Sequence, residues 1–198
     1  MATSPWIAFL DSDDEWAPDK LHQQLCAAKQ YPDIKIVHTN EIWIRSGKRV
    51  NPMKKHEKKG GWIFSDCLPL CAISPSSVMI HREVFQCVGL FDETLPACED
   101  YDLWLRITSR FEVMYLDQLL TIKYGGHVDQ LSQKYWGMDR FRIQALHNII
   151  KEDVLSSENQ QLATSMLKEK ITIFLAGALK RNNFTYHKTY EAILDELD

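Results

Sequence analysis

The sequence predicts an α/β fold, in which a mixed β-sheet with flanking helices is followed by an all-helical C-terminal segment. Up to about residue 130, short apolar runs typical of strands alternate with amphipathic patterns typical of helices. From residue 133 onward, helical patterns dominate. We therefore divide the 198 residues into a core, 1–132, and a helical extension, 133–198.

The first element is a short apolar run at 6–10 that ends abruptly in acidic residues. A run that is apolar throughout is typical of a fully buried strand inside a mostly parallel sheet. Pro18 then opens a helix at its first turn, where a missing N–H costs nothing. We expect Leu21, Leu25 and Ala28 to form the apolar face of that helix.

The remaining elements follow from apolar runs, glycines and helical periodicity. Residues 51–61 are polar and lysine-rich without periodicity, so we predict a loop there. A turn is predicted at Ser46-Gly47. The predicted strands are 34–38, 41–45, 77–80, 112–116 and 119–124. The predicted helices are 62–68, 82–88, 99–110, 134–152, 157–181 and 184–197.

Composition and charge argue against several classes of protein. Hydrophobic residues make up 45% and charged residues 25%, ordinary values for a globular protein. The net charge of −4 offers no basic excess for binding nucleic acid. No apolar stretch approaches the ~20 residues of a membrane span, and the N-terminus lacks signal-peptide features, so we expect a cytoplasmic protein. The five cysteines include no C-x-x-C pair, which favours plain thiols over a zinc site.

An acidic cluster at 11–14 (DSDD) follows the first strand directly. Three carboxylates within four residues repel one another, and a divalent cation such as Mn²⁺ or Mg²⁺ is the usual reason for tolerating them. In open α/β sheets, ligands bind beyond the carboxyl ends of strands, where this cluster would lie. Helix capping explains one such Asp but hardly three. An EF-hand loop is disfavoured because Glu15 and Trp16 stand at its fifth and sixth positions.

A second acidic motif, Glu99-Asp100, opens the predicted helix at 99–110. Taken alone, these acids would be explained by complementarity with the helix dipole. Together with the earlier acidic cluster, however, they match a known pattern. Residues 6–21 (WIAFLDSDDEW, then PDKL) and 89–106 (GLFDE, then EDYDLWLR) closely resemble two motif segments of inverting family 2 glycosyltransferases. The stretch 124–132, with its Y-x-x-H string, is similar to a later and less specific segment of that family.

The resemblance covers about residues 5–135 and implies part of a GT-A fold, which is Rossmann-like. It also implies a metal-dependent transfer of sugar with inversion. Asp100 would be the base that takes the proton from an acceptor hydroxyl, and the metal would neutralise charge on the leaving diphosphate. The implied site residues are Asp11, Asp13 and His127 for the metal, Asp11, Asp14 and Glu99 for substrate binding, and Asp100 for catalysis.

The implied partners are a nucleotide-sugar donor, with a UDP-sugar favoured, and a saccharide or lipid-linked acceptor in cell-envelope polysaccharide or lipopolysaccharide synthesis. Lys54, Lys55, Lys58 and Lys59 precede Gly60-Gly61 in the predicted loop. Such a loop could attract a sugar diphosphate, a lipid-phosphate acceptor or the inner face of the membrane in peripheral contact. A solvated loop is the commoner meaning of such a charge run.

The chain departs from the family in one respect, since the N-terminal strands that usually hold the nucleotide do not precede the strand at 6–10. A fragment, a genuine short form and an inactive relative are all open explanations. A non-catalytic interaction module built on the same fold is an alternative function. A phosphatase is a weaker one, because Glu15 stands where that family has Thr or Val. An unpaired apolar strand favours self-association, so we expect a homo-oligomer.

Overall fold

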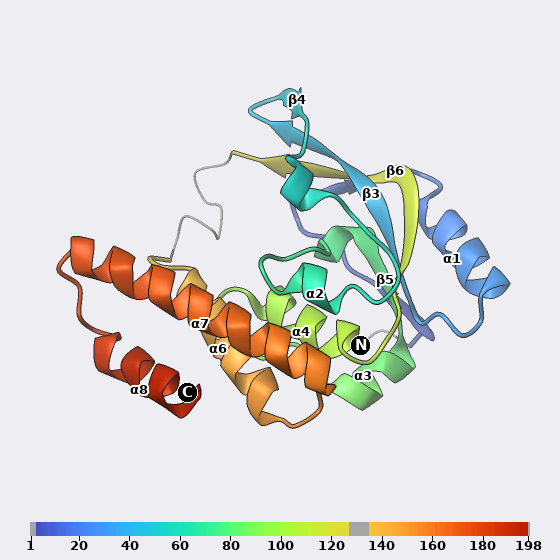
Figure 1. Cartoon of the computed structure of the whole chain (residues 1–198). Helices are drawn as coiled ribbons and strands as arrows, with labels where there is room; N and C mark the ends of the chain where they lie inside the picture. The colour runs from blue at the N-terminus through green and yellow to red at the C-terminus, as the bar shows by residue number, and fades with distance from the viewer. Residues whose placement is uncertain (1–2, 127–134, 198) are drawn as a thin grey trace.

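The computed structural model describes residues 3–126 and 135–197 and has a curled mixed sheet between layers of helices (Figure 1). Helix α1 (Lys20–Gln30) covers one face of the sheet. Helices α2 (Phe64–Cys67), α3 (Arg82–Val88) and α4 (Glu99–Thr108) cover the other face. The helices of the C-terminal extension pack outside α4. The predicted α/β class, with a mixed sheet followed by helices, is confirmed.

Six strands of the described residues form one sheet in the order β1-β5-β3-β6-β2, with β4 paired to β3. β3 and β6 are parallel, and the other pairs are antiparallel. Val37 faces α1 while its neighbour Ile36 faces the main core, as the two-residue period of a strand requires. The strands are β1 (Trp6–Ala8), β2 (Glu15–Trp16), β3 (Ile36–Arg45), β4 (Lys48–Val50), β5 (Val78–His81) and β6 (Met114–Gly125).

Two pairs of predicted strands are single long strands in the structure, β3 and β6. The prediction divided each at polar residues, but these residues bond to each other across the two strands. The amide nitrogen of Asn40 donates to the carboxylate of Asp117 at 2.9 Å, where the register between the strands shifts. The predicted turn at Ser46-Gly47 is confirmed, and φ values of 49° and 74° suit a tight hairpin.

The expectation of a fully buried strand inside a mostly parallel sheet is wrong for the run at 6–10. β1 covers only Trp6–Ala8, its residues are half-buried, and it lies at one end of the strand order. It pairs antiparallel with β5, with Trp6 opposite His81. Its apolar character comes instead from packing on both sides, because Ala8 faces the core under α1 and Phe9 joins the main core.

The predicted apolar face of α1 is wrong for Leu21 and Leu25 and is confirmed for Ala28. Leu21 and Leu25 are exposed, whereas Lys20, Gln24 and Ala28 face the sheet. Polar contacts explain this choice of face, because the Gln24 amide donates to the carbonyls of residues 37 and 77, at 2.7 and 3.0 Å. The Lys20 ammonium donates to Gln24 at 2.8 Å and lies over the Trp16 ring. Helix α1 is therefore tied to the sheet by hydrogen bonds and by only a small apolar contact.

The C-terminal extension consists of α6 (Asp139–Lys151), α7 (Ser157–Lys180) and α8 (His187–Leu197). One continuous hydrophobic core runs from Ile36 in the sheet through α4 to Ile193 in α8. The predicted boundary between residues 132 and 133 lies outside the described residues and stays a prediction. No helix in the described ranges combines the length and apolar character needed to cross a membrane.

Candidate active site

The acidic cluster at 11–14 leaves β1 and is fixed from both sides. Phe9 packs edge-on against Phe85 and Phe91, with ring centroids 6.3 and 5.5 Å away. The backbone N–H of Asp11 donates to the Ser76 hydroxyl at 3.0 Å, and the indole N–H of Trp16 donates to the Ser76 carbonyl at 2.7 Å. The loop is thus held on the short 3₁₀ helix η2 (Pro75–Ser77) that leads into β5.

Within this loop the three carboxylates differ in exposure. Asp11 and Asp13 are exposed, whereas Asp14 is buried. One carboxylate oxygen of Asp14, Oδ1, accepts the backbone N–H of Tyr124 at 3.2 Å, and Oδ2 lies 3.9 Å from Nζ of Lys123. Burial raises the pKa of Asp14, although Ser76, Lys123 and Tyr124 act against this. Asp14 therefore ties the loop to β6, and the substrate contact expected of it stays a prediction.

The second acidic motif opens α4 as predicted. Cys98 precedes it in a left-handed conformation, with φ of 62°, which turns the chain sharply into the helix. Asp100 is half-buried, and its Oδ2 accepts a hydrogen bond from the Cys71 thiol at 3.0 Å. Its Oδ1 accepts the backbone N–H of Tyr101 at 2.7 Å. Two donors therefore fix the orientation of the Asp100 carboxylate at the positive end of a helix dipole.

The fold brings the two acidic motifs together, although about ninety residues separate them in sequence. Burial raises the pKa of Glu99, and the negative charges of Asp100 and Asp11 raise it further. Residues 3–126 and 135–197 contain no ready-made group of three metal-ligating side chains. Asp11 and Asp13 nevertheless offer exposed carboxylate oxygens, the donor type that Mn²⁺ and Mg²⁺ prefer. His127, the third predicted ligand, lies outside the described residues.

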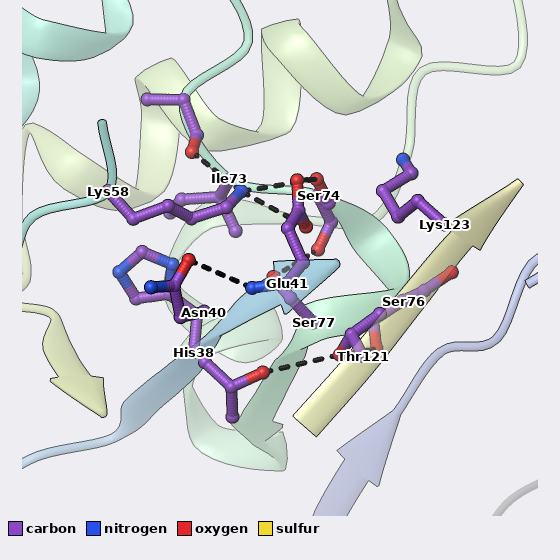
Figure 2. Close-up of polar contacts among 12 residues, drawn as sticks. His38, Asn40, Glu41, Lys58, Ile73, Ser74, Ser76, Ser77, Thr121 and Lys123 are labelled. Atoms are coloured by element: carbon purple, nitrogen blue, oxygen red, sulfur yellow. Dashed lines mark hydrogen bonds and ion pairs between the residues drawn. The ribbon is translucent and has the colours of Figure 1, made fainter. Parts of the chain in front are cut away.

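Beside the acidic motifs lies a buried polar cluster that the sequence did not reveal, formed by Glu41, Lys58 and Ser74 (Figure 2). The Lys58 ammonium lies 3.3 Å from the Glu41 carboxylate, and these side chains are only 6% and 3% exposed. Lys58 also donates to the Ser74 hydroxyl at 3.2 Å and to the Ala72 carbonyl at 3.3 Å. The Ser74 hydroxyl and the Trp43 indole both donate to Glu41.

The charges of this cluster depend on one another. Burial alone would raise the pKa of Glu41, but Lys58, Lys123 and the hydrogen bonds to Glu41 hold it below the ordinary value. Burial lowers the pKa of Lys58, and Glu41 opposes that effect. Burial also acts against the charge on Lys123, but Glu41, Asp14 and Asp11 raise its pKa overall. Lys123 therefore links the buried cluster electrostatically to the acidic loop.

A cavity of about 700 Å³ opens above this cluster. Its wall includes Glu41, Cys71 and Ser74, so it adjoins both the buried ion pair and the thiol that bonds to Asp100. The basic side chains that line it come from the lysine-rich loop and from α6 and α7. They are Lys54, Lys55, Lys58, Lys59, Arg142 and Lys170.

Sequence reasoning therefore missed three parts of this region. It took Lys58 as part of an exposed loop, whereas its ammonium is buried on Glu41. The sequence predicts a plain thiol at Cys71, because a lone cysteine carries no signal of a hydrogen bond to an acid 29 residues away. The extension showed no chemistry, although Arg142 and Lys170 lie at helix positions that face the cavity.

The chain is similar in sequence to known glycosyltransferases. The family model described as glycosyltransferase like family 2 matches residues 1–154. An uncharacterized glycosyltransferase of Rickettsia bellii (strain RML369-C) is 31% identical over 139 residues, which are 65% of this chain and 19% of the relative. The amylovoran biosynthesis glycosyltransferase AmsB of Erwinia amylovora is 32% identical over 115 residues, which are 54% of this chain and 37% of AmsB.

A third relative is the Escherichia coli enzyme named UDP-Glc:alpha-D-GlcNAc-diphosphoundecaprenol beta-1,3-glucosyltransferase WfgD. It is 31% identical over 112 residues, which are 54% of this chain and 39% of WfgD. The chain thus spans less than half the length of each of these relatives. Among solved structures, S. aureus TarS 1–349 in complex with UDP-GlcNAc has a TM-score of 0.64 at 16% identity. That match covers 94% of this chain and 53% of the TarS chain, and it shows a shared fold.

Proposed function

Because the chain belongs to glycosyltransferase like family 2, we propose that it carries the sugar-transferring part of a glycosyltransferase that uses a nucleotide-sugar donor. The proposal is supported most by the closeness of the two acidic motifs, because the negative charge of Asp11 contributes to the raised pKa of Glu99. One motif follows the first strand and the other opens a helix, so a donor and an acceptor can approach from different elements.

On the donor side, Asp11 and Asp13 would hold Mn²⁺ or Mg²⁺, with His127 as a further ligand. When bound, the cation would stabilise the negative charge on the leaving nucleoside diphosphate as a Lewis acid. Asp14 holds the loop that carries Asp11 and Asp13 in place, because its carboxylate accepts a hydrogen bond from the Tyr124 backbone and so fixes the loop on β6. The negative charges of Asp14 and Glu41 raise the pKa of Lys123 and so keep a positive charge next to the same loop.

On the acceptor side, Asp100 would accept the proton of the attacking hydroxyl, and Glu99 would position the acceptor sugar. The oxygen that attacks would form its bond to the anomeric carbon as the bond to the diphosphate breaks. Attack from the opposite face inverts that carbon. The hydrogen bonds from Cys71 and Tyr101 hold the Asp100 carboxylate in one orientation before substrate arrives.

The setting we propose is the assembly of a cell-envelope polysaccharide or lipopolysaccharide on a saccharide or lipid-linked acceptor. Two relatives support it, because AmsB is named for amylovoran biosynthesis and WfgD for glucosyl transfer to a diphosphoundecaprenol-linked sugar. A UDP-sugar donor is favoured because the name of WfgD includes UDP-Glc and TarS was solved with UDP-GlcNAc.

The experiment is to compare Asp100→Asn and Asp13→Ala with the exposed control Asp33→Asn. Donor binding is read from thermal unfolding of this chain with Mn²⁺ and UDP, and transfer is read with a UDP-sugar and a lipid-linked sugar. A ligand at 100 times its dissociation constant adds about 2.7 kcal/mol, which raises the melting temperature by roughly 5–10 °C.

We expect Asp13→Ala to lose the nucleotide-dependent shift. Asp100→Asn should keep the shift while transfer falls by about 10²–10⁴-fold, the usual contribution of a general base. The Asp33→Asn control should keep both. Normal turnover by Asp100→Asn would remove Asp100 from the proposed role, and a shift that survives Asp13→Ala would do the same for Asp13.

A further inference from the structure

We propose that the cavity above Glu41 and Lys58 binds a phosphate or diphosphate group of the acceptor, so that the acceptor hydroxyl is presented to Asp100. The inference rests on the proposed transferase function and adds an anion subsite to it. Three observations carry it: the charge of the cavity lining, its connection to Asp100, and its separation from the acidic loop at 11–14.

The lining of the cavity has an excess of positive charge. Six lysine and arginine side chains line it, against four aspartate and glutamate side chains. Lys59 pairs with Asp66 at 2.6 Å, and Lys58 pairs with Glu41. Lys54 and Lys55 have no ion-pair partner within residues 3–126 and 135–197. These two cations are therefore available to an incoming anion.

The part of the lining that comes from α6 and α7 adds to this positive field. Arg142 and Lys170 share one carboxylate, that of Asp139, at 2.9 and 3.8 Å. Burial lowers the pKa of His56, and the charges of Lys55 and Lys58 lower it further, as expected where the local potential is positive. A phosphate group carries the charge and the oxygen acceptors that lysine and arginine donors bind most strongly.

The cavity connects to the acceptor side of the site. Cys71 stands in its wall, and the Cys71 thiol donates to Asp100 at 3.0 Å. Ala72 and Ser74, close to Cys71 in sequence, line the same wall and accept hydrogen bonds from Lys58. Figure 2 shows Ser74 beside the Lys58 ammonium. The segment that orients Asp100 therefore also forms the cavity. A group bound in the cavity would therefore lie beside the proposed base.

The cavity is separate from the proposed donor site. None of the residues 11–14, all of which the structure describes, belongs to its lining. The diphosphate of a nucleotide-sugar would bind at that loop with the metal. The donor therefore does not need a second anion subsite, and the cavity is left for the acceptor. The C-terminal extension completes the cavity, because Lys170 of α7 donates to the Pro69 carbonyl at 3.0 Å and holds α7 against this wall.

The test measures binding of inorganic pyrophosphate to this chain by calorimetry, in EDTA and without added metal. The variant is Lys54→Gln/Lys55→Gln, which removes two exposed cations that pair with no described residue. Its matched control is Lys29→Gln/Lys188→Gln, which removes two exposed lysines elsewhere. We expect affinity to fall by about tenfold or more in the first variant, from two lost charge-assisted bonds, and to stay unchanged in the control.

Asp13→Asn separates the two sites. Metal-free pyrophosphate binding that survives Asp13→Asn but not Lys54→Gln/Lys55→Gln supports the subsite. Binding that requires Mn²⁺ and is lost in Asp13→Asn would place the anion at the donor loop and overturn the inference. So would equal affinity in the wild type and in Lys54→Gln/Lys55→Gln. Because this measurement needs no sugar transfer, its result stands whether or not the transferase assay succeeds.

Farnesyl diphosphate and farnesol separate the possible sources of the phosphate. Farnesyl diphosphate binding more tightly than pyrophosphate, with the same loss in Lys54→Gln/Lys55→Gln, identifies a lipid diphosphate. Equal affinity of the two identifies recognition of the phosphate group alone, as in a phosphate-bearing saccharide. An affinity for farnesol equal to that for farnesyl diphosphate would overturn the inference, because the diphosphate group would then contribute nothing to binding.

Discussion

Replacing Glu41 by Gln leaves the Lys58 ammonium buried without its counter-charge. Gln keeps the shape of Glu and much of its hydrogen bonding to Trp43 and Ser74. The paired side chains are 6% and 3% exposed, so water cannot replace the lost partner. Removing one member of a buried pair costs about 3–5 kcal/mol. Because Lys58 keeps its hydrogen bonds to Ala72 and Ser74, we expect the free energy of unfolding to fall by about 3 kcal/mol, the lower end of that range.

The measurement is reversible unfolding in urea, with circular dichroism as the readout, for wild type, Glu41→Gln and Lys58→Met/Glu41→Gln. A loss of about 3 kcal/mol corresponds to a fall of roughly 6–12 °C in melting temperature for a domain of this size. The double variant should recover part of the loss, because it leaves no unpaired charge. Glu57→Gln is the matched control in the loop that carries Lys58, and its exposed side chain predicts a change in unfolding free energy within about 0.5 kcal/mol.

The pH dependence tests the charge itself. The pKa of Glu41 is lowered in the folded chain, so its contribution is present above the ordinary value of 4.5 and is lost as pH falls through the folded value. In Glu41→Gln, the folded chain favours the neutral form of Lys58, because burial lowers its pKa. In the unfolded chain Lys58 stays charged up to its ordinary pKa of about 10.5. The free energy of unfolding of this variant should therefore rise as the pH rises towards that value. The difference in the free energy of unfolding between wild type and Glu41→Gln should therefore become smaller towards pH 10. A difference that stays constant from pH 6 to 10 would refute the charged pair and indicate a packing defect.

Three other substitutions test single contacts. Burial lowers the pKa of Lys20 to about 8, so wild-type stability should rise between pH 8 and 10.5 as the folded chain releases a proton first; Lys20→Met should lose this rise in pH-dependent melting curves. Gly60→Ala should cost about 1–3 kcal/mol in urea unfolding, because its Cβ would meet the Val113 carbonyl oxygen at 3.0 Å. Tyr101→Phe should lower stability by a similar amount in calorimetry, because the Leu68 carbonyl loses a buried hydrogen bond of 2.5 Å from the Tyr101 hydroxyl. Unchanged stability of Gly60→Ala or Tyr101→Phe would contradict the contact that the substitution tests.

The sequence allowed most of the fold to be predicted, and the errors have a common cause. Helix starts and stops such as Gly89 were local signals, and the structure confirms them. The long strands β3 and β6 were divided because Asn40 and Asp117 interrupt the apolar pattern, yet each satisfies the other across the sheet. The sequence predicts the wrong face of α1 because a buried lysine such as Lys20 is rare. Its contacts with Gln24 and Trp16 make that burial tolerable.

The candidate site was predictable where it rests on short motifs. Asp11, Asp13, Glu99 and Asp100 stand in strings that carry their own signal, and folding brings these strings together. The partners that tune them could not be predicted, because they come from distant segments without a motif. Cys71 reaches Asp100 from 29 residues away in sequence. Roles of individual residues at the site stay predictions until the variants are measured.

The hydrophobic core that runs from the sheet into the extension makes the two parts one folding unit. Leu103 and Trp104 of α4 and Ile143 and Leu146 of α6 belong to the same buried cluster. A cleavage between the parts would expose both apolar surfaces at once, so neither half should survive alone as a protease-resistant fragment. Calorimetry of the chain should accordingly record a single heat-absorption peak, and the helices of the extension should melt together with the sheet.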